Sequence, residues 1–165
     1  MNVDSLLQTH AEVAVALAGF ASVAAVLQRP LSPHSRMRFL SILFAALIQV
    51  LSGLVPVWLS NIGVSGPTLW RTATALVLFL SIPLIVWVII QIRALGGVSV
   101  ILINVPVTRI TNALSAIVLG ALLLNLVGVP VAPGFGLYYA SSLLGLSVVF
   151  VLFASVVVDS DAESS

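Results

Sequence analysis

The chain of 165 residues is 61% hydrophobic and only 7% charged, with a net charge of +1. A soluble domain is about half apolar and a quarter charged, so this composition excludes a water-soluble fold and predicts an integral membrane protein in a lipid bilayer. The small net charge gives no case for a nucleic-acid partner, and the absence of cysteine and lysine excludes disulfides, thiolate metal sites and Schiff-base cofactors.

Five apolar stretches follow one another, each close to the roughly 20 residues that a helix needs to cross a bilayer. Groups of proline and glycine separate these stretches and provide the turns. The expected fold is therefore all-α, a polytopic transmembrane bundle of five helices that forms a single domain over residues 1–165. The five expected spans are residues 9–28, 36–60, 68–93, 107–128 and 137–158. An alternative fold has four spans and a re-entrant final hairpin.

The first expected span opens with Thr9-His10-Ala11-Glu12, which fits a capping box. In that motif the Thr9 hydroxyl and the Glu12 carboxylate satisfy the first free amides of the helix. Glu12 is also the only carboxylate near a span, and a carboxylate buried in a membrane is an ion or proton site by default. His10 lies beside it, so Glu12 and His10 form a candidate ion or proton site, with no third metal ligand nearby.

The loop after the first span orients the chain. Residues 28–38 contain Arg29, Arg36 and Arg38, half of the six cationic residues, and short arginine-rich loops usually remain in the cytoplasm. We therefore expect the N-terminus outside and the C-terminus cytoplasmic, in a multi-pass protein of the cell inner membrane. Aromatic residues that favour the interface then fall at the outer helix ends, with Trp87 as the exception. These residues are Trp58, Trp70, Tyr138 and Tyr139.

Catalytic groups are missing from the spans. Their interiors hold no histidine, aspartate or lysine, on which intramembrane hydrolases depend. His10 and His34 are expected on opposite sides of the membrane, so the two cannot ligate one haem iron. We therefore expect no enzyme activity and no cofactor.

Neutral polar residues form a stripe on the second span and another on the fourth. Such stripes either hold helices together, within the bundle or between copies, or line a pathway for a solute or ion. Small residues such as Ala18 on the first span are expected at helix contacts for the same reason. The candidate residues of the two stripes are Gln49, Ser52 and Pro56 on the second span and Thr111, Ser115 and Asn125 on the fourth.

Two functions remain after these exclusions. The first is a structural or accessory subunit that packs with itself or with another membrane protein. The alternative is a small oligomeric channel or transporter, with a neutral polar pathway lined by the second and fourth spans. In both, the partners are the lipid bilayer and either copies of the chain or other membrane subunits.

Overall fold

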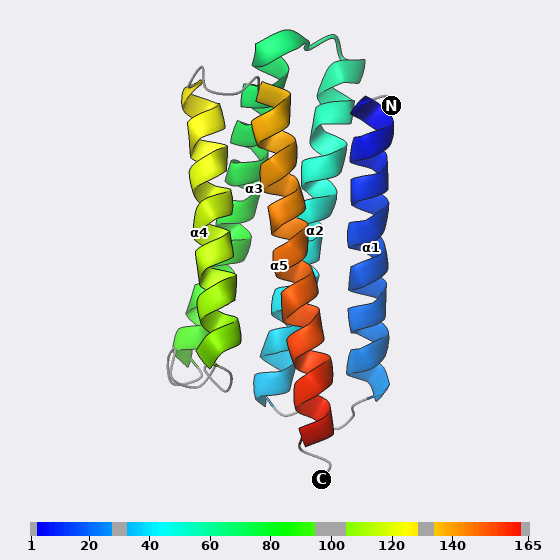
Figure 1. Ribbon diagram of the computed structural model, residues 1–165, viewed down its shortest axis with the longest axis vertical. Coiled ribbons are helices and arrows are strands. Elements are labelled where there is room, and N and C mark those ends of the chain that lie inside the picture. The colour runs from blue at the N-terminus through cyan, green and yellow to red at the C-terminus, as the bar shows by residue number, and fades with distance from the viewer. Residues whose placement is uncertain (1–2, 28–32, 95–104, 129–133, 163–165) are drawn as a thin grey trace.

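The computed structural model describes residues 3–27, 33–94, 105–128 and 134–162, and these residues form five long helices without any strand (Figure 1). Each helix is long and apolar enough to cross a membrane. The predicted all-α polytopic bundle is therefore confirmed, and α5, with 29 residues, runs along the bundle instead of turning back inside it. The helices are α1 (Val3–Leu27), α2 (Pro33–Asn61), α3 (Gly66–Ala94), α4 (Val105–Val127) and α5 (Gly134–Ala162).

The predicted start of the first helix is wrong. α1 begins at Val3, so Thr9 lies inside the helix, where its hydroxyl donates to the Ser5 carbonyl at 2.8 Å and caps nothing. Glu12 accepts a bond from the Gln8 carboxamide at 3.1 Å, one helical turn away, in place of the backbone bond of a capping box. The helix continues towards the N-terminus because Leu7 is buried in an apolar cluster with residues of α2, α3 and α5.

Glycines end two of the helices at the expected turns. After α2, the Gly63 amide donates to the Ser60 carbonyl at 3.0 Å and the Val64 amide donates to the Leu59 carbonyl at 3.1 Å. This pair of bonds is a Schellman motif, which needs a left-handed residue at Gly63, where φ is +90°. Gly128 ends α4 in the same backbone region, with φ of +77°.

α2 packs against α1, α3 and α5, whereas α4 packs against α3 and α5 (Figure 1). One apolar cluster joins α1, α2 and α5 around Ala21, Ile42 and Val149, and Ala18 packs against it, as predicted for a helix contact. The span of α4 is only 6% buried, against 24–39% for the other four. α4 therefore lies at the edge of the bundle and presents most of its surface to lipid.

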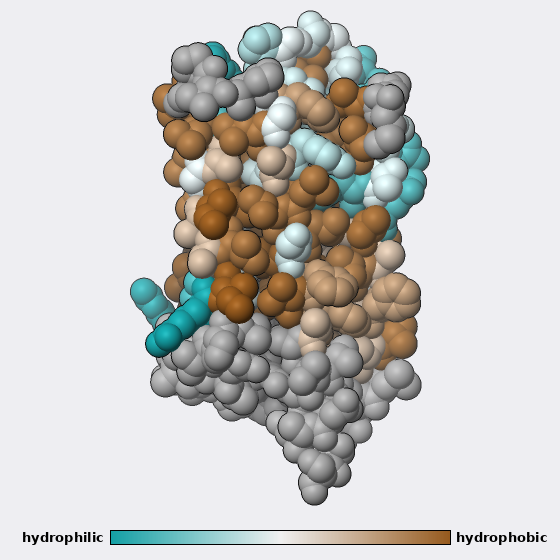
Figure 2. Space-filling model, viewed as in Figure 1, coloured by the Kyte–Doolittle hydropathy of each residue, from teal (hydrophilic) through white to brown (hydrophobic). Residues whose placement is uncertain are grey.

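The surface fits a lipid environment, because hydrophobic side chains cover most of the described face in Figure 2. Arg93 and Arg109 lie at one end of the bundle and Arg71 near the other. The Arg71 guanidinium lies over Gly128 at the C-terminal end of α4, where the helix dipole favours a cation. This contact gives a structural reason for an arginine at this end of the bundle. Arg29 lies outside the described residues.

Candidate functional site

Polar side chains meet at one buried contact between α1, α2 and α5. His10 from α1 is 3% exposed, and its Nε2 lies 3.3 Å from the Ser52 hydroxyl on α2. The Ser52 hydroxyl donates to the Gln49 carbonyl at 2.8 Å. When the single hydroxyl proton is used in this bond, the contact with His10 requires the tautomer that carries its proton on Nε2 and donates to Ser52. His10 Nδ1 is then an acceptor, and no described residue donates to it.

Pro56 and Tyr138 explain why α5 also packs at this contact. Pro56 lies inside α2 and has no amide proton, so the carbonyl of Ser52, four residues earlier, loses its helical partner. The Tyr138 hydroxyl donates to that carbonyl at 2.7 Å, and the tyrosine is fully buried. An aromatic side chain of α5 thus replaces the hydrogen bond that the proline removes from α2.

Two glycines allow these helices to approach closely. A Cβ atom at Gly53 of α2 would lie 2.7 Å from the Leu7 carbonyl oxygen and 3.0 Å from the Ala11 Cβ, both on α1. A Cβ atom at Gly145 of α5 would overlap the Gln49 carboxamide. Small residues at these positions let backbone and amide groups meet across the helices, as is common in membrane bundles.

A second polar contact joins α3 to α4. The Asn125 carboxamide donates to the Thr74 hydroxyl at 2.8 Å, and the Thr74 hydroxyl donates to the Trp70 carbonyl at 2.7 Å. Asn125 also lies 3.5 Å from that carbonyl. Asn125 and Thr74 are both buried. This group of three therefore fixes the outermost helix to the bundle.

The structure does not bring the two predicted polar stripes together. Gln49, Ser52 and Pro56 are buried at the contact of α2 with α1 and α5, whereas Asn125 contacts α3. On α4, the Thr111 hydroxyl is buried and accepts no bond from the described residues, and Ser115 is exposed on the outer surface. Within one copy of the chain, the α2 residues and Asn125 therefore belong to separate helix contacts.

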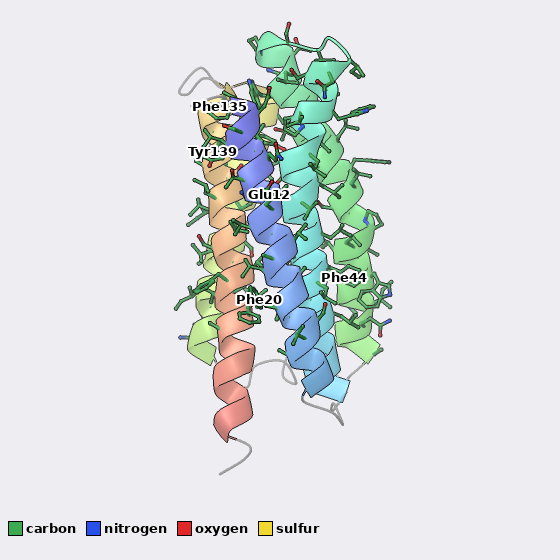
Figure 3. All side chains as sticks on the ribbon, turned by 90° about the vertical axis from the view of Figure 1, so that its right-hand side faces the viewer. Glu12, Phe20, Phe44, Phe135 and Tyr139 are labelled. Atoms are coloured by element: carbon green, nitrogen blue, oxygen red, sulfur yellow. The ribbon has the colours of Figure 1, made fainter. Side chains whose placement is uncertain are left out.

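Glu12 lies on the other side of α1 from the buried contact. At 100° per residue, His10 and Glu12 are about 160° apart, so one faces α2 and the other faces outward. Figure 3 shows α1 in front, with Glu12 on its upper half and Phe20 below it. His10 and Glu12 therefore do not form one ion site, and the described residues contain no group of three metal-ligating side chains.

An exposed stripe surrounds Glu12 on this outward face. Gln8, Thr9, Glu12, Ala16 and Gly19 are all exposed and fall within about 100° of arc. We call them the α1 outer stripe. A Cβ atom at Gly19 would meet nothing within 4 Å, so the surface there is open. Figure 2 shows the hydrophilic upper part of this helix on the right flank of the bundle.

The register of α1 against α2 gives the depth of Glu12. His10 lies level with Ser52, and Gly53 packs between Leu7 and Ala11, which are one turn apart on α1. The α2 span runs over Phe39–Asn61, so its midpoint is residue 50. Glu12 is two residues, or about 3 Å, beyond His10 towards that midpoint. The carboxyl group therefore lies near the middle of the span, on the outside of the bundle.

Sequence reasoning found most of the polar residues but missed two partners, Tyr138 and Thr74. Tyr138 was treated as an interfacial aromatic, although the carbonyl four residues before Pro56 needs a donor. That rule predicts that a donor exists but not which helix supplies it. Thr74 carries no signal of its own, because a threonine in a helix normally bonds within its own helix.

Comparison with known proteins gives no relative, since no protein-family model, curated protein or solved structure matches the chain. The class of protein is defined by the fold alone, as a bundle of five helices able to span a membrane.

Proposed function

We propose that this chain is an accessory membrane subunit that packs against another membrane protein, or against a copy of itself, through the α1 outer stripe. The observation that carries the proposal is the exposed Glu12 near the middle of the α2 span. Insertion scales assign about 2.5–3.5 kcal/mol to a charged side chain at the centre of a membrane helix. A protein partner that hydrogen-bonds the carboxyl group offsets that cost.

The small residues of the α1 outer stripe support the same function. Ala16 and Gly19 follow Glu12 on the outward face and have no described neighbour that fills the space beside Gly19. Small residues at helix surfaces let a second helix approach to backbone contact, and polar side chains then add hydrogen bonds across the interface. The stripe combines both features on one face.

The test is the mass of the particle extracted from its own membranes in a mild detergent. We expect native mass spectrometry to find the chain in a complex larger than its own 17.2 kDa. Ala16→Leu should dissociate that complex, whereas the matched Ala116→Leu on the exposed side of α4 should leave it intact. A wild-type chain that is monomeric under these conditions would contradict the proposal.

Cysteine reactivity tests the alternative of a channel or transporter. Gln49 is packed against Gly145 and Ser52, and Asn125 is bonded to Thr74. Cysteines introduced in place of Gln49 and Asn125 should therefore not react with a small polar thiol reagent in intact membranes. A cysteine at exposed Ser65 is the positive control, since the wild-type chain has no cysteine. Rapid reaction at both buried positions would favour a water-filled pathway.

We also propose the orientation that the arginine distribution predicts, with the N-terminus outside. Label attached at Ser65, in the turn between α2 and α3, should then be reached only from outside, and label at Ser32 only from the cytoplasm. Accessibility of both positions from one side of sealed vesicles would reject five full spans, and exchange of the two sides would reverse the orientation.

A further inference from the structure

The Glu12 carboxyl group has an incomplete set of hydrogen bonds. The Gln8 carboxamide donates to one of its oxygens at 3.1 Å. The bond from Gln8 reaches one of the two Glu12 carboxylate oxygens, and the Glu12 side chain is exposed. A carboxylate accepts up to about four hydrogen bonds, so most of its capacity points outward, away from the bundle.

None of the cationic side chains that the structure describes forms an ion pair with Glu12. The arginines whose side chains the structure describes, Arg71, Arg93 and Arg109, lie on α3 and α4, whereas α1 packs against α2 and α5. The other three cations are in residues 28–38, beyond the inner end of α1 in the sequence. A complementary charge near the middle of the membrane must therefore come from a different molecule.

A second copy of the chain is a poor source of that charge. Two copies inserted in the same direction and packed stripe against stripe meet about a twofold axis along the membrane normal, so equal levels of the two stripes lie opposite each other. Glu12 would then face Glu12, which brings a second carboxyl group and no cation. The arginines of the second copy would lie at the same levels as those of the first.

We propose that the α1 outer stripe binds a transmembrane helix of a different protein, one that carries an arginine or a lysine near the middle of its span. The cation pairs with Glu12, and an arginine can donate to both carboxylate oxygens, because its guanidinium has five N–H groups in a fixed fork. The small residues Ala16 and Gly19, which follow Glu12 along α1, leave space for the same helix to pack closely. This inference rests on the accessory function proposed above and adds the chemistry of the partner.

The experiment measures binding of host helices to the full chain in phosphatidylcholine vesicles. The chain carries a fluorescent donor on Ser65→Cys, away from the stripe. The probes are two acceptor-labelled 21-residue leucine–alanine peptides, identical except for arginine or leucine at the central position. We expect the arginine peptide to bind at least about tenfold more tightly than the leucine peptide, which corresponds to about 1.4 kcal/mol.

Two variants assign this preference to the stripe. Glu12→Gln keeps the size and exposure of the side chain and removes its charge, so it should abolish the tenfold difference. Gly19→Leu keeps Glu12 and fills the open surface, so it should weaken binding of both peptides. If the midpoint temperature of thermal unfolding of both variants is close to that of the parent chain, the bundle remains folded in both.

The results that overturn the inference are distinct from those that overturn the function. Equal binding of the two peptides, or a preference that survives Glu12→Gln, rejects a cationic partner helix. Energy transfer between two copies of the chain that Gly19→Leu removes identifies a second copy as the occupant, which rejects the inference and leaves the accessory function in place. Binding of neither peptide, together with a monomeric native particle, rejects both.

Discussion

Gly53→Leu should separate α1 from α2 and produce the largest loss of stability of any single change considered for this bundle. The Cβ position at Gly53 already lies 2.7 Å from the Leu7 carbonyl oxygen, and a backbone atom of a packed helix cannot rotate away as a side chain can. Overpacking costs typically 1–3 kcal/mol, and we expect about 3 kcal/mol here because a whole helix must move. Unfolding in a detergent titration gives the free energy.

Gly120→Leu is the matched control for Gly53→Leu. Gly120 lies within α4, and a Cβ atom there would meet nothing within 4 Å. Leucine has a higher helix propensity than glycine, by up to about 1 kcal/mol, so this change should be neutral or slightly stabilising. The two substitutions are chemically identical. Equal losses of stability would therefore show that Gly53→Leu does not act by disrupting the α1–α2 contact.

The α1–α2 contact also predicts a local consequence for the polar groups. Moving α1 away from α2 breaks the bond between His10 and Ser52 and exposes His10 to solvent or lipid. Hydrogen exchange should therefore increase in the N-terminal half of α1 in Gly53→Leu, while the α3–α4 contact through Asn125 remains protected. The loss of protection from hydrogen exchange should therefore be confined to α1, the helix that moves.

The apolar pattern of the sequence was enough to predict the five helices, because each must satisfy its own backbone in lipid and needs about 20 apolar residues. The proline and glycine turns placed most helix ends within a few residues. The predicted start of α1 was wrong because the burial of Leu7 depends on residues of α2, α3 and α5, which are distant in sequence. A local capping motif contains no information about such a contact.

The candidate site was harder to predict than the fold. Periodicity placed Gln49, Ser52 and Pro56 on one face, and they are buried together. It does not give the order of helices around the bundle, so it did not separate these residues from Asn125. The depth of Glu12 was also missed, because it follows from the register of α1 against α2. That register depends on the close approach at Gly53, which has no Cβ atom, and on the hydrogen bond between His10 and Ser52.

Tyr138→Phe should destabilise the bundle by about 1–3 kcal/mol, the cost of leaving a buried polar group without its partner. The phenylalanine keeps the ring and its contact with Trp70, where the ring centroids are 5.6 Å apart, so the change isolates the hydroxyl. The group left unpaired is the Ser52 carbonyl, which has no helical donor because residue 56 is proline. Detergent unfolding of the purified chain measures the loss.

A double-mutant cycle with Pro56→Ala tests this explanation directly. Alanine restores an amide proton that can bond the Ser52 carbonyl within α2, so the Tyr138 hydroxyl is no longer its only donor. In that background Tyr138→Phe should cost about 1 kcal/mol less than in the wild type, a coupling within the range for residues in contact. Tyr139→Phe, which removes a hydroxyl from the neighbouring, partly buried ring, should change stability by no more than about 0.5 kcal/mol in either background. Equal costs of Tyr138→Phe with and without the proline would show that the hydroxyl stabilises the bundle in some way other than by replacing the missing helical bond.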